Sequence, residues 1–459
     1  SVSYESTFRQ ATMLSCYFNL TNTIVGSGML GLPYAYAASG WVVGTFLLLI
    51  CGASSAFALH TLSLCAQKMG TPASFYSIAS HAMPSLTLVI DAAVAIKCFG
   101  VATSYLIVVG DLMPDVMEQF GAAKAAQSRE LWVFLAFICV APLCVLRNLD
   151  SLKFTSTLSI AFVFFLTLLV VLYSADIEGL DPCEAVDDGD SCVGSTAIAK
   201  VDIHTFQVLS IFVFGYTCQQ NIFAVTNEIE RPTMTRMNTV VVGAIFTAFC
   251  VYMIVAGAGY STYGSEVDPD ILVNYPKTFL TSIARLFVSF LVVSSYPLQC
   301  HPSRRSILSL LHHWDNYRHG MTDEPAPVAG DLTTTASPLQ DGVQMTKVES
   351  EGEEGVNKKA LLLPGGYQLT EAQQRTRYII VTTCFLGLSL LIGLTVSNLG
   401  TVLALVGATG STTVSYILPG FFYYILFQNE GPAWKRHLAL VQGILGLIIV
   451  PVALTFIFI

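Results

Sequence analysis

The chain alternates between long apolar stretches and short polar ones, and the apolar stretches have the length of membrane-crossing helices. Such a helix needs about 20 mainly apolar residues. Eleven segments of this kind follow one another, at about 11–38, 41–66, 86–119, 130–147, 154–174, 204–227, 238–261, 279–301, 377–396, 398–427 and 437–459. Strands of an outer-membrane barrel would alternate in polarity over shorter runs. The sequence therefore predicts an all-α integral membrane protein with eleven transmembrane helices.

Composition and charge agree with lipid as the main solvent. Only 12% of the residues are charged and 53% are hydrophobic, whereas a soluble domain carries about 25% charged residues. An ordinary soluble enzyme and a disordered chain are therefore excluded. The net charge is −9, with 22 basic residues against 31 acidic ones and no basic patch, so we expect no nucleic-acid partner.

The positions of the basic residues predict the orientation of the spans. Lys and Arg gather on the cytoplasmic side of membrane proteins. With the N-terminus in the cytoplasm, sixteen basic residues lie inside and four lie outside, at Lys124, Arg129, Lys200 and Lys277. Eleven spans then place the C-terminus on the outer or lumenal side.

The outer loop at 175–203 separates a first repeat of helices, at about 11–174, from a second that begins at 204. This loop carries eight acidic residues and one basic residue, together with Cys183 and Cys192. Paired cysteines in an oxidising compartment favour a disulfide over two free thiols.

A second polar segment divides the later spans. Residues 1–301 are expected to hold helices one to eight, and residues 375–459 helices nine to eleven. Residues 302–374 between them are rich in Pro, Thr and Asp and contain the acidic run ESEGEEG. This composition predicts a disordered cytoplasmic linker.

Spans one and six carry residues that interrupt a helix. Span one contains three glycines and a proline, at Gly26, Gly28, Gly31 and Pro33, and span six is interrupted by Gly215, Thr217, Gln219, Gln220 and Asn221. Glycine weakens a helix and proline removes a backbone donor. In span one, close packing of small residues is the alternative. A polar cavity is favoured instead by the polar residues around the interruption of span one, which are Asn19, Asn22, Thr23 and Ser27.

The spacing of the two interruptions points to a class of protein. Span six lies five spans after span one, so the interruptions fall at corresponding positions of two five-helix halves. Transporters built from inverted repeats bind their substrate at such discontinuous helices. Half-helix N-termini can bind an anionic group such as an amino-acid carboxylate.

Five motifs in the chain resemble those of a known family. They are residues 19–33 (NLTNTIVGSGMLGLP), 214–223 (FGYTCQQNIF) with Asn227 and Glu228, 259–264 (GYSTYG), 296–304 (YPLQCHPSR) and 407–413 (GATGSTT). Together they resemble the amino acid/auxin permease family, above all its sodium-coupled neutral amino-acid transporters and its fungal and plant vacuolar amino-acid transporters. The resemblance covers essentially all eleven spans.

The resemblance implies a fold and an activity. The fold is the leucine-transporter-type 5+5 inverted repeat with one extra helix, in which helices 1 and 6 are discontinuous. The activity is amino-acid transport as a secondary active symporter, with sodium or a proton as the coupling ion and no other cofactor. Gln219 departs from the family, because histidine is common there in the vacuolar relatives, and this weakens a proton-relay role at that position.

The candidate substrate-binding residues surround the two interruptions. Span one supplies hydroxyl and backbone donors at Thr23, Gly26, Ser27 and Gly28. Span six borders the side-chain pocket with Phe214, Gly215, Tyr216 and Thr217. Three further candidates are Tyr105, which has an ordinary packed aromatic as its alternative, and Ser411 and Thr412, whose small hydroxyls often only pack helices.

Asn22, Ser294 and Ser295 form the candidate sodium site. The adjacent hydroxyls of span eight face the span-one interruption in the fold that the resemblance implies, and Asn22 matches the family's sodium-linked asparagine. The alternative is that Ser294 and Ser295 donate to carbonyls of their own helix.

Three charged residues are candidates for coupling or gating. An intramembrane charge is costly and points to function. Lys97 could replace a cation, titrate, pair with Asp91 or extend to the inner interface. Arg285 could face an outer vestibule or pair with an acid such as Asp111 or Glu266. Glu228 could form an inner-gate or interfacial ion pair.

Two functional classes fit these features of the sequence. The first is a transporter of amino acids, expected to be neutral because no acidic cluster lies at the interruptions, and expected to act as a monomer in lipid. The second is an amino-acid sensor with little or no transport. An enzyme is disfavoured, since no motif such as HExxH is present. A vacuolar or lysosomal membrane and the plasma membrane both fit the acidic outer loop.

Overall fold

The structure is a computed structural model that describes residues 11–70, 73–145, 152–175, 177–184, 192–319 and 369–457. Within these ranges it is all-helical, with no strand and one isolated bridge between Ala11 and Ile229. Eight stretches of these residues are long and apolar enough to cross a membrane: Ser27–Met69, Pro84–Gln119, Ile203–Glu228, Met234–Glu266, Phe279–Arg318, Ala372–Thr395, Leu399–Leu426 and Ala433–Ile457. The chain is therefore a multi-pass membrane protein.

Among the described residues, the first half of the chain has six α-helices. They are α1 (Met13–Ile24), α2 (Leu32–Met69), α3 (Phe75–Ala82), α4 (Thr87–Gln119), α5 (Arg129–Val145) and α6 (Leu152–Ser174). The second half forms α7 (Ile203–Gly215), α8 (Gln219–Glu228), α9 (Met234–Tyr263), α10 (Ile271–Asn274), α11 (Phe279–Arg318), α12 (Glu371–Thr395), α13 (Leu399–Val406), α14 (Leu418–Leu426) and α15 (Ala433–Ile457). The predicted count of eleven spans stays a prediction, because α1 and α5 are short, with 12 and 17 residues.

Side-chain caps explain why several helices begin where they do. Thr12 caps α1 by accepting from the N–H of Ser15 at 3.2 Å. Asp202 and Thr278 each form a capping box at the start of α7 and α11. A cap of this kind satisfies backbone donors that the first turn of a helix leaves unpaired.

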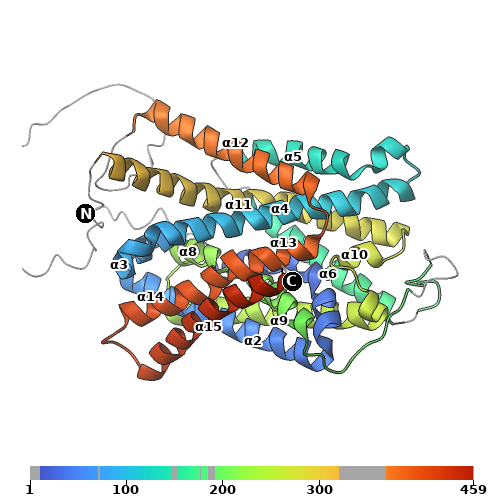
Figure 1. Cartoon of the computed structure of the whole chain (residues 1–459), viewed down its shortest axis with the longest axis horizontal. Helices are drawn as coiled ribbons and strands as arrows, with labels where there is room; N and C mark the ends of the chain where they lie inside the picture. The colour runs from blue at the N-terminus through green and yellow to red at the C-terminus, as the bar shows by residue number, and fades with distance from the viewer. Residues whose placement is uncertain are drawn as a thin grey trace, which may run out of the picture.

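The helices pack into one bundle whose long members run side by side (Figure 1). The most extensive contacts join α11 to α4 and α2 to α9. Large apolar side chains also lie on the outside, and Phe46, Phe164 and Phe246 are 58%, 71% and 65% exposed. Soluble proteins rarely expose so much apolar surface, so these faces are suited to contact lipid.

The cysteines of the loop between α6 and α7 are bonded. Cys183 and Cys192 form a disulfide with their Cα atoms 5.7 Å apart, which confirms the predicted pair. We call this end of the bundle the disulfide end, and the opposite end, where α11 ends and α12 begins, the linker end. Figure 1 shows α3 at the linker end, on the left, and α10 at the disulfide end, on the right.

Two boundaries differ from those predicted. Helix α2 contains both the end of the first predicted span and all of the second, with a kink at Gly40, whose φ of 77° suits glycine. The linker was expected to begin at 302, but α11 continues to Arg318 and α12 already begins at Glu371. The helix continues past the apolar run because Arg304 is buried and donates to the carbonyl oxygen of Cys144 at 2.7 Å. Residues 320–368 lie outside the described ranges.

Candidate functional site

The first interruption lies where α1 ends. Helix α1 ends at Ile24, and the chain passes through Val25 and Gly26 into a 3₁₀ turn, η1 (Ser27–Gly31), before α2 begins. Pro33 occupies the first turn of α2, where its missing N–H breaks no hydrogen bond of the helix. We call residues 25–31 the first break. All of η1 is buried, so this non-helical backbone lies inside the protein.

The second interruption separates α7 from α8. Helix α7 ends at Gly215 and α8 begins at Gln219, and we call residues 216–218 the second break. The N–H of Thr217 donates to the carbonyl oxygen of Phe214 at 3.0 Å. The Thr217 hydroxyl donates to that of Val213 at 2.8 Å, so Thr217 closes the end of α7. No side chain caps the start of α8.

The two breaks contact each other at glycines. A Cβ atom on Gly28 would lie 3.0 Å from the ring of Phe214 and 3.1 Å from the Cα of Gly215. Such distances are tighter than most real Cβ contacts, so the approach of the first break to the end of α7 favours glycine at position 28. The structure therefore brings together two of the predicted groups of site residues.

A tyrosine that the sequence analysis did not single out lies at this junction. The hydroxyl of Tyr252, on α9, lies 2.7 Å from the carbonyl oxygen of Ile24 and 2.7 Å from that of Gly215. These carbonyls end α1 and α7, and the Tyr252 side chain is fully buried. One hydroxyl proton is thus shared between the two helix ends. The chain has 19 tyrosines, and nothing in the neighbouring sequence distinguishes this one.

The other predicted residues of span one connect it to neighbouring helices. The hydroxyl of Thr23 donates to the carbonyl oxygen of Asn19 at 2.9 Å and accepts from the side-chain amide of Asn221, on α8, at 2.6 Å. The hydroxyls of Ser27 and Ser104 lie 3.3 Å apart. These contacts join the end of α1 to α8, and the first break to α4.

Tyr105, on α4, also reaches the first break. Its hydroxyl would lie 3.6 Å from a Cβ on Gly26, and the residue is buried. This placement agrees with a role at the site, although an ordinary packed aromatic would have the same burial.

Behind the second break lies a buried polar network centred on Gln219. Its side-chain oxygen accepts from the Ser415 hydroxyl at 2.7 Å and from the N–H of Cys218 at 3.0 Å. Its amide nitrogen donates to the hydroxyl of Ser55, on α2, at 2.9 Å. The Ser55 hydroxyl in turn donates to the Tyr216 carbonyl oxygen at 2.9 Å. The network fixes the backbone of the second break against α2 and the helix of Ser415.

The predicted hydroxyls of span ten lie in an unusual stretch of helix. Between α13 and α14 the chain forms two wide π-helical segments, Gly407–Ser411 and Thr413–Ile417. Such segments often accompany functional sites. Thr412 donates to the carbonyl oxygen of Gly407 at 2.7 Å. Ser411 is fully buried, and its hydroxyl makes no hydrogen bond with the described residues.

The candidate sodium ligands are buried on two helices. Asn22 lies on α1, and Ser294 and Ser295 lie on α11. The hydroxyl of Ser294 donates to the carbonyl oxygen of Phe290 in its own helix at 2.6 Å, which is the alternative named above. The grouping of Asn22, Ser294 and Ser295 as a sodium site stays a prediction.

Lys97 is enclosed by protein. Its side chain is 1% exposed, so it does not extend to a surface, as snorkelling would require. Its backbone packs against Gly410 in the first π-helical segment, where a Cβ would lie 2.5 Å from the Cβ of Lys97. No ion pair with Asp91 is found among the described residues.

The partner of Arg285 differs from the two acids predicted for it. The guanidinium pairs with Asp115 at 3.3 Å, and not with Asp111 or Glu266. Asp111 is engaged instead by Arg129 at 2.7 Å. Residues 111 and 115 are one helical turn apart and share a face of α4, so a partner predicted from polarity alone could be wrong by one turn.

Glu228 lies at the linker end, where the start of α1 meets the end of α8. Its carbonyl oxygen accepts from the N–H of Ala11 at 3.1 Å, and the N–H of Glu230 donates to the carbonyl oxygen of Ala11 at 3.0 Å. Asn227 exchanges two hydrogen bonds with the backbone of Ala73, at 2.9 and 3.0 Å. These hydrogen bonds join the end of α8 to the start of α1 and to Ala73 at the linker end.

A cavity of about 410 Å³ opens elsewhere, between α5 and α12. Its lining is mainly apolar and includes Phe137, Tyr378 and Thr382. None of its lining residues belongs to either break, so it is not the candidate site.

Comparison with known proteins agrees with this architecture. Residues 9–459 match the family described as transmembrane amino acid transporter protein. The chain is 34% identical over 426 residues to vacuolar amino acid transporter 6 of Saccharomyces cerevisiae, covering 92% of this chain and 91% of that protein. It is 33% identical over 420 residues to vacuolar amino acid transporter 5 of Schizosaccharomyces pombe, covering 90% and 84%.

A less similar relative is named for sodium coupling and not for the vacuole. The sodium-coupled neutral amino acid transporter 7 of Rattus norvegicus is 25% identical over 328 residues, covering 68% of this chain and 67% of that protein. The family match spans nearly the whole chain, and the two fungal relatives exceed 30% identity over most of their own length. The chain therefore belongs to the transmembrane amino acid transporter family.

Proposed function

We propose that the chain is a secondary active transporter that moves amino acids, neutral ones in particular, across a membrane by alternating access. The observation that carries this proposal is the junction of the two breaks at Tyr252, in a chain whose relatives are named as amino acid transporters. In the proposed fold, eleven helices cross the membrane. Spans one to five and six to ten form inverted repeats, and span eleven is an addition.

The substrate would bind between the two breaks. The start of α8 has no side-chain cap, and unpaired N–H groups at a helix start attract a carboxylate. The substrate carboxylate would contact the residues of the first interruption, Thr23, Gly26, Ser27 and Gly28. The substrate side chain would contact those of the second, Phe214, Gly215, Tyr216 and Thr217. Two further contacts would be Tyr105 and Ser411. Neither break contains an acidic residue, which supports a neutral substrate.

Alternating access would open one end of the bundle at a time. At the linker end, the bridge of Ala11 to Glu228 and Glu230 would separate. At the disulfide end, Arg285 would release the carbonyl oxygens of Leu272 and Tyr275, to which it donates. Both sets consist of hydrogen bonds that water can replace, so their opening is compatible with reversible motion.

The coupling ion would be sodium or a proton. Sodium prefers several oxygen ligands, and Asn22, Ser294 and Ser295 supply side-chain oxygens. The lone pairs of Ser294 remain available while its proton is donated to Phe290. A proton mechanism would use Lys97, which is buried and packs against Gly410 in the first π-helical segment. Symport with either ion is compatible with the buried positions of these residues.

The names of the fungal relatives support a vacuolar or lysosome-like membrane rather than the plasma membrane. The excess of basic residues at the linker end supports a cytoplasmic N-terminus and an outer or lumenal C-terminus.

Uptake into proteoliposomes tests the proposal. The purified chain is reconstituted, and uptake of a panel of radiolabelled amino acids is measured while sodium and pH gradients are varied separately, with protein-free liposomes as the control. We expect saturable uptake of a neutral amino acid that at least one gradient accelerates. Absence of flux with every amino acid under both gradients would contradict transport, and amino-acid binding in that case would favour a sensor.

A further inference from the structure

The connection between α9 and α11 folds inward at the disulfide end. Within it, residues 267–275, which we call the α10 segment, include the short helix α10. Pro269 packs against Gly31, at the end of the first break, and against Gly400, at the start of α13. A Cβ on Gly400 would lie 2.9 Å from the Cβ of Pro269. The segment therefore covers the first break from the disulfide end.

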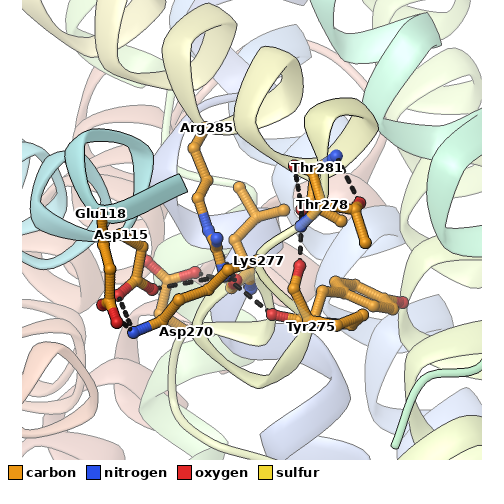
Figure 2. A network of polar contacts seen from close by, with 10 residues as sticks. Asp115, Glu118, Asp270, Tyr275, Lys277, Thr278, Thr281 and Arg285 are labelled. Carbon is orange, nitrogen blue, oxygen red and sulfur yellow. Dashed lines mark hydrogen bonds and ion pairs between the residues drawn. The ribbon is translucent and has the colours of Figure 1, made fainter. Parts of the chain in front are cut away.

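Arg285 holds the α10 segment in place. One of its terminal nitrogens donates to the carbonyl oxygens of Leu272 and Tyr275, at 2.9 and 2.8 Å, and also pairs with Asp115 at 3.3 Å. Figure 2 shows this arginine on α11, with Asp115 and Glu118 of α4 opposite. The Arg285 side chain is fully buried. A single guanidinium thus joins α4, α11 and the α10 segment.

Asp270 is a buried residue of the α10 segment whose carboxyl group is only partly hydrogen-bonded. The residue is 1% exposed. Its Oδ1 atom accepts from the N–H of Leu272 at 3.0 Å and so caps α10. Its Oδ2 atom accepts no hydrogen bond from any described residue. An ionised carboxylate buried with an unpaired oxygen is costly, whereas a protonated one carries no charge to desolvate.

The charges around Asp270 are mainly of the same sign. Asp111 of α4 and Asp268 of the same connection disfavour its ionisation, and Arg285 of α11 favours it. Asp111 and the guanidinium of Arg285 are themselves paired, with Arg129 and Asp115. The first break and α13, against which Pro269 packs, contain no charged residue. Arg285 is already paired with Asp115, so it offsets the negative charges of Asp111 and Asp268 only in part.

We propose that Asp270 is a proton-binding site, protonated while the α10 segment covers the first break and ionised once the segment lifts into solution. The segment is then a proton-sensitive lid at the disulfide end. Describing the lid as a gate rests on the proposed transport function, but the binding of the proton does not.

The sign of the effect follows from linkage. Burial first, and then Asp111 and Asp268, raise the pKa of Asp270 to about 7 in the covered state. In a lifted, hydrated segment the ordinary value for Asp is about 3.9. Between these values covering the break binds a proton. The lid is therefore fully stabilised below about pH 4 and loses stability as the pH rises to about 7, with no further change above that pH.

Thiol labelling of the full chain in lipid nanodiscs measures the lid directly, without substrate. Ile271→Cys reports on a fully buried position of the lid, and Ser265→Cys on an exposed position nearby. The ratio of their labelling rates with a polar maleimide cancels the intrinsic pH dependence of the thiol. Labelling of the unmodified chain is subtracted. We expect this ratio to rise at least about tenfold between pH 5 and pH 7.5. The pKa values of Asp270 in the covered and lifted states differ by about three units, which allows a rise of that size.

Asparagine at position 270 is the decisive variant. Asp270→Asn keeps an oxygen to cap α10 and removes the charge, so the ratio should stay low and independent of pH. Asp268→Asn is the matched control, because it removes one negative charge from an exposed neighbour, and its ratio should still rise. A rise that persists in Asp270→Asn, or that Asp268→Asn abolishes, would overturn the proposal.

A second variant tests the proposal even if Asp270→Asn does not fold. Asp111→Asn removes a negative charge that disfavours ionisation of Asp270, so the midpoint of the rise should move to lower pH; an unmoved midpoint overturns the proposal. The outcome is independent of transport. A normal pH-dependent lid in a chain without uptake would contradict the proposed function alone.

Discussion

The hydroxyl of Tyr252 lies 2.7 Å from the carbonyl oxygen of Gly215, at the end of α7. The same hydroxyl lies 2.7 Å from the carbonyl oxygen of Ile24, at the end of α1. A helix end leaves its last carbonyls without partners inside the helix. Tyr252 therefore satisfies a need that the two breaks create, and it makes the position of one break depend on the other.

Replacement of Tyr252 by phenylalanine should impair transport while preserving the fold. The ring still packs against Tyr216, whose centroid lies 5.2 Å away, but two buried carbonyls lose their shared donor. An unsatisfied buried group costs about 1–3 kcal/mol, so we expect a loss of about tenfold or more in the initial rate of amino-acid uptake in proteoliposomes.

Tyr263→Phe is the control for this substitution. Tyr263 lies on the same helix, is also buried, and donates to the carbonyl oxygen of Pro182 at 3.3 Å, away from both breaks. Its loss should change the uptake rate less than twofold. Equal effects of the two variants would show that Tyr252 only stabilises α9.

Alanine at position 28 should separate the two breaks. The added methyl group would lie 3.1 Å from the Cα of Gly215, which cannot move without moving α7. Overpacking of this kind costs about 1–3 kcal/mol, and we expect uptake to fall by about tenfold or more. Gly387→Ala in α12 is the matched control, because nothing lies within 4 Å of its Cβ position. Normal uptake by Gly28→Ala would mean that the breaks do not need this close contact.

The sequence predicted helix positions well where lipid imposes a pattern, and less well where packing decides. A span needs a long apolar run, so α4 and α9 were found close to their observed bounds. Helix α3 was missed because its 8 residues are too few for a membrane-length apolar run, and the end of α11 because it lies in polar sequence. The end of α11 depends on Arg304, which is buried against Cys144 and Thr382, and no local pattern specifies such partners.

The site was predictable to the extent that backbone chemistry specifies it. The glycines of span one predicted an interruption at a polar cavity, with close packing as the alternative, and Gly28 makes the close contact that the alternative describes. Tyr252 was missed because its contact with Ile24 joins residues 228 positions apart. The position of Arg285 was recognised as unusual, yet its partner was wrong, because Asp111 and Asp115 share one helix face and only the packed structure selects between them.

The proposed sodium site makes a prediction that the structure leaves open. Asn22→Ala and Ser295→Ala each remove an oxygen ligand, so each should raise the sodium concentration for half-maximal uptake, while Ser261→Ala should not. Ser261 is exposed and donates to its own helix at 2.8 Å. Measurement of uptake against sodium concentration checks this. Wild-type sodium dependence in both ligand variants, or uptake that never depends on sodium, would contradict the site.

The network behind the second break predicts energetic coupling between Gln219 and Ser415. Gln219→Leu removes one hydrogen bond each from the Ser415 hydroxyl, the Ser55 hydroxyl and the N–H of Cys218. Ser415→Ala removes one of these three groups. The double variant should therefore be less destabilised than the sum of the single variants, by about 1 kcal/mol.

Thermal unfolding of the four proteins in detergent measures this coupling, provided that the unfolding is reversible. The control cycle combines Gln219→Leu with Ser389→Ala, since Ser389 is buried and its hydrogen bonds join it to Tyr296 and Leu386. That pair should be additive within about 0.5 kcal/mol. If both cycles are additive, the Gln219–Ser415 hydrogen bond does not contribute to stability, and the second break must be held by other contacts, such as that of Ser55 with Tyr216.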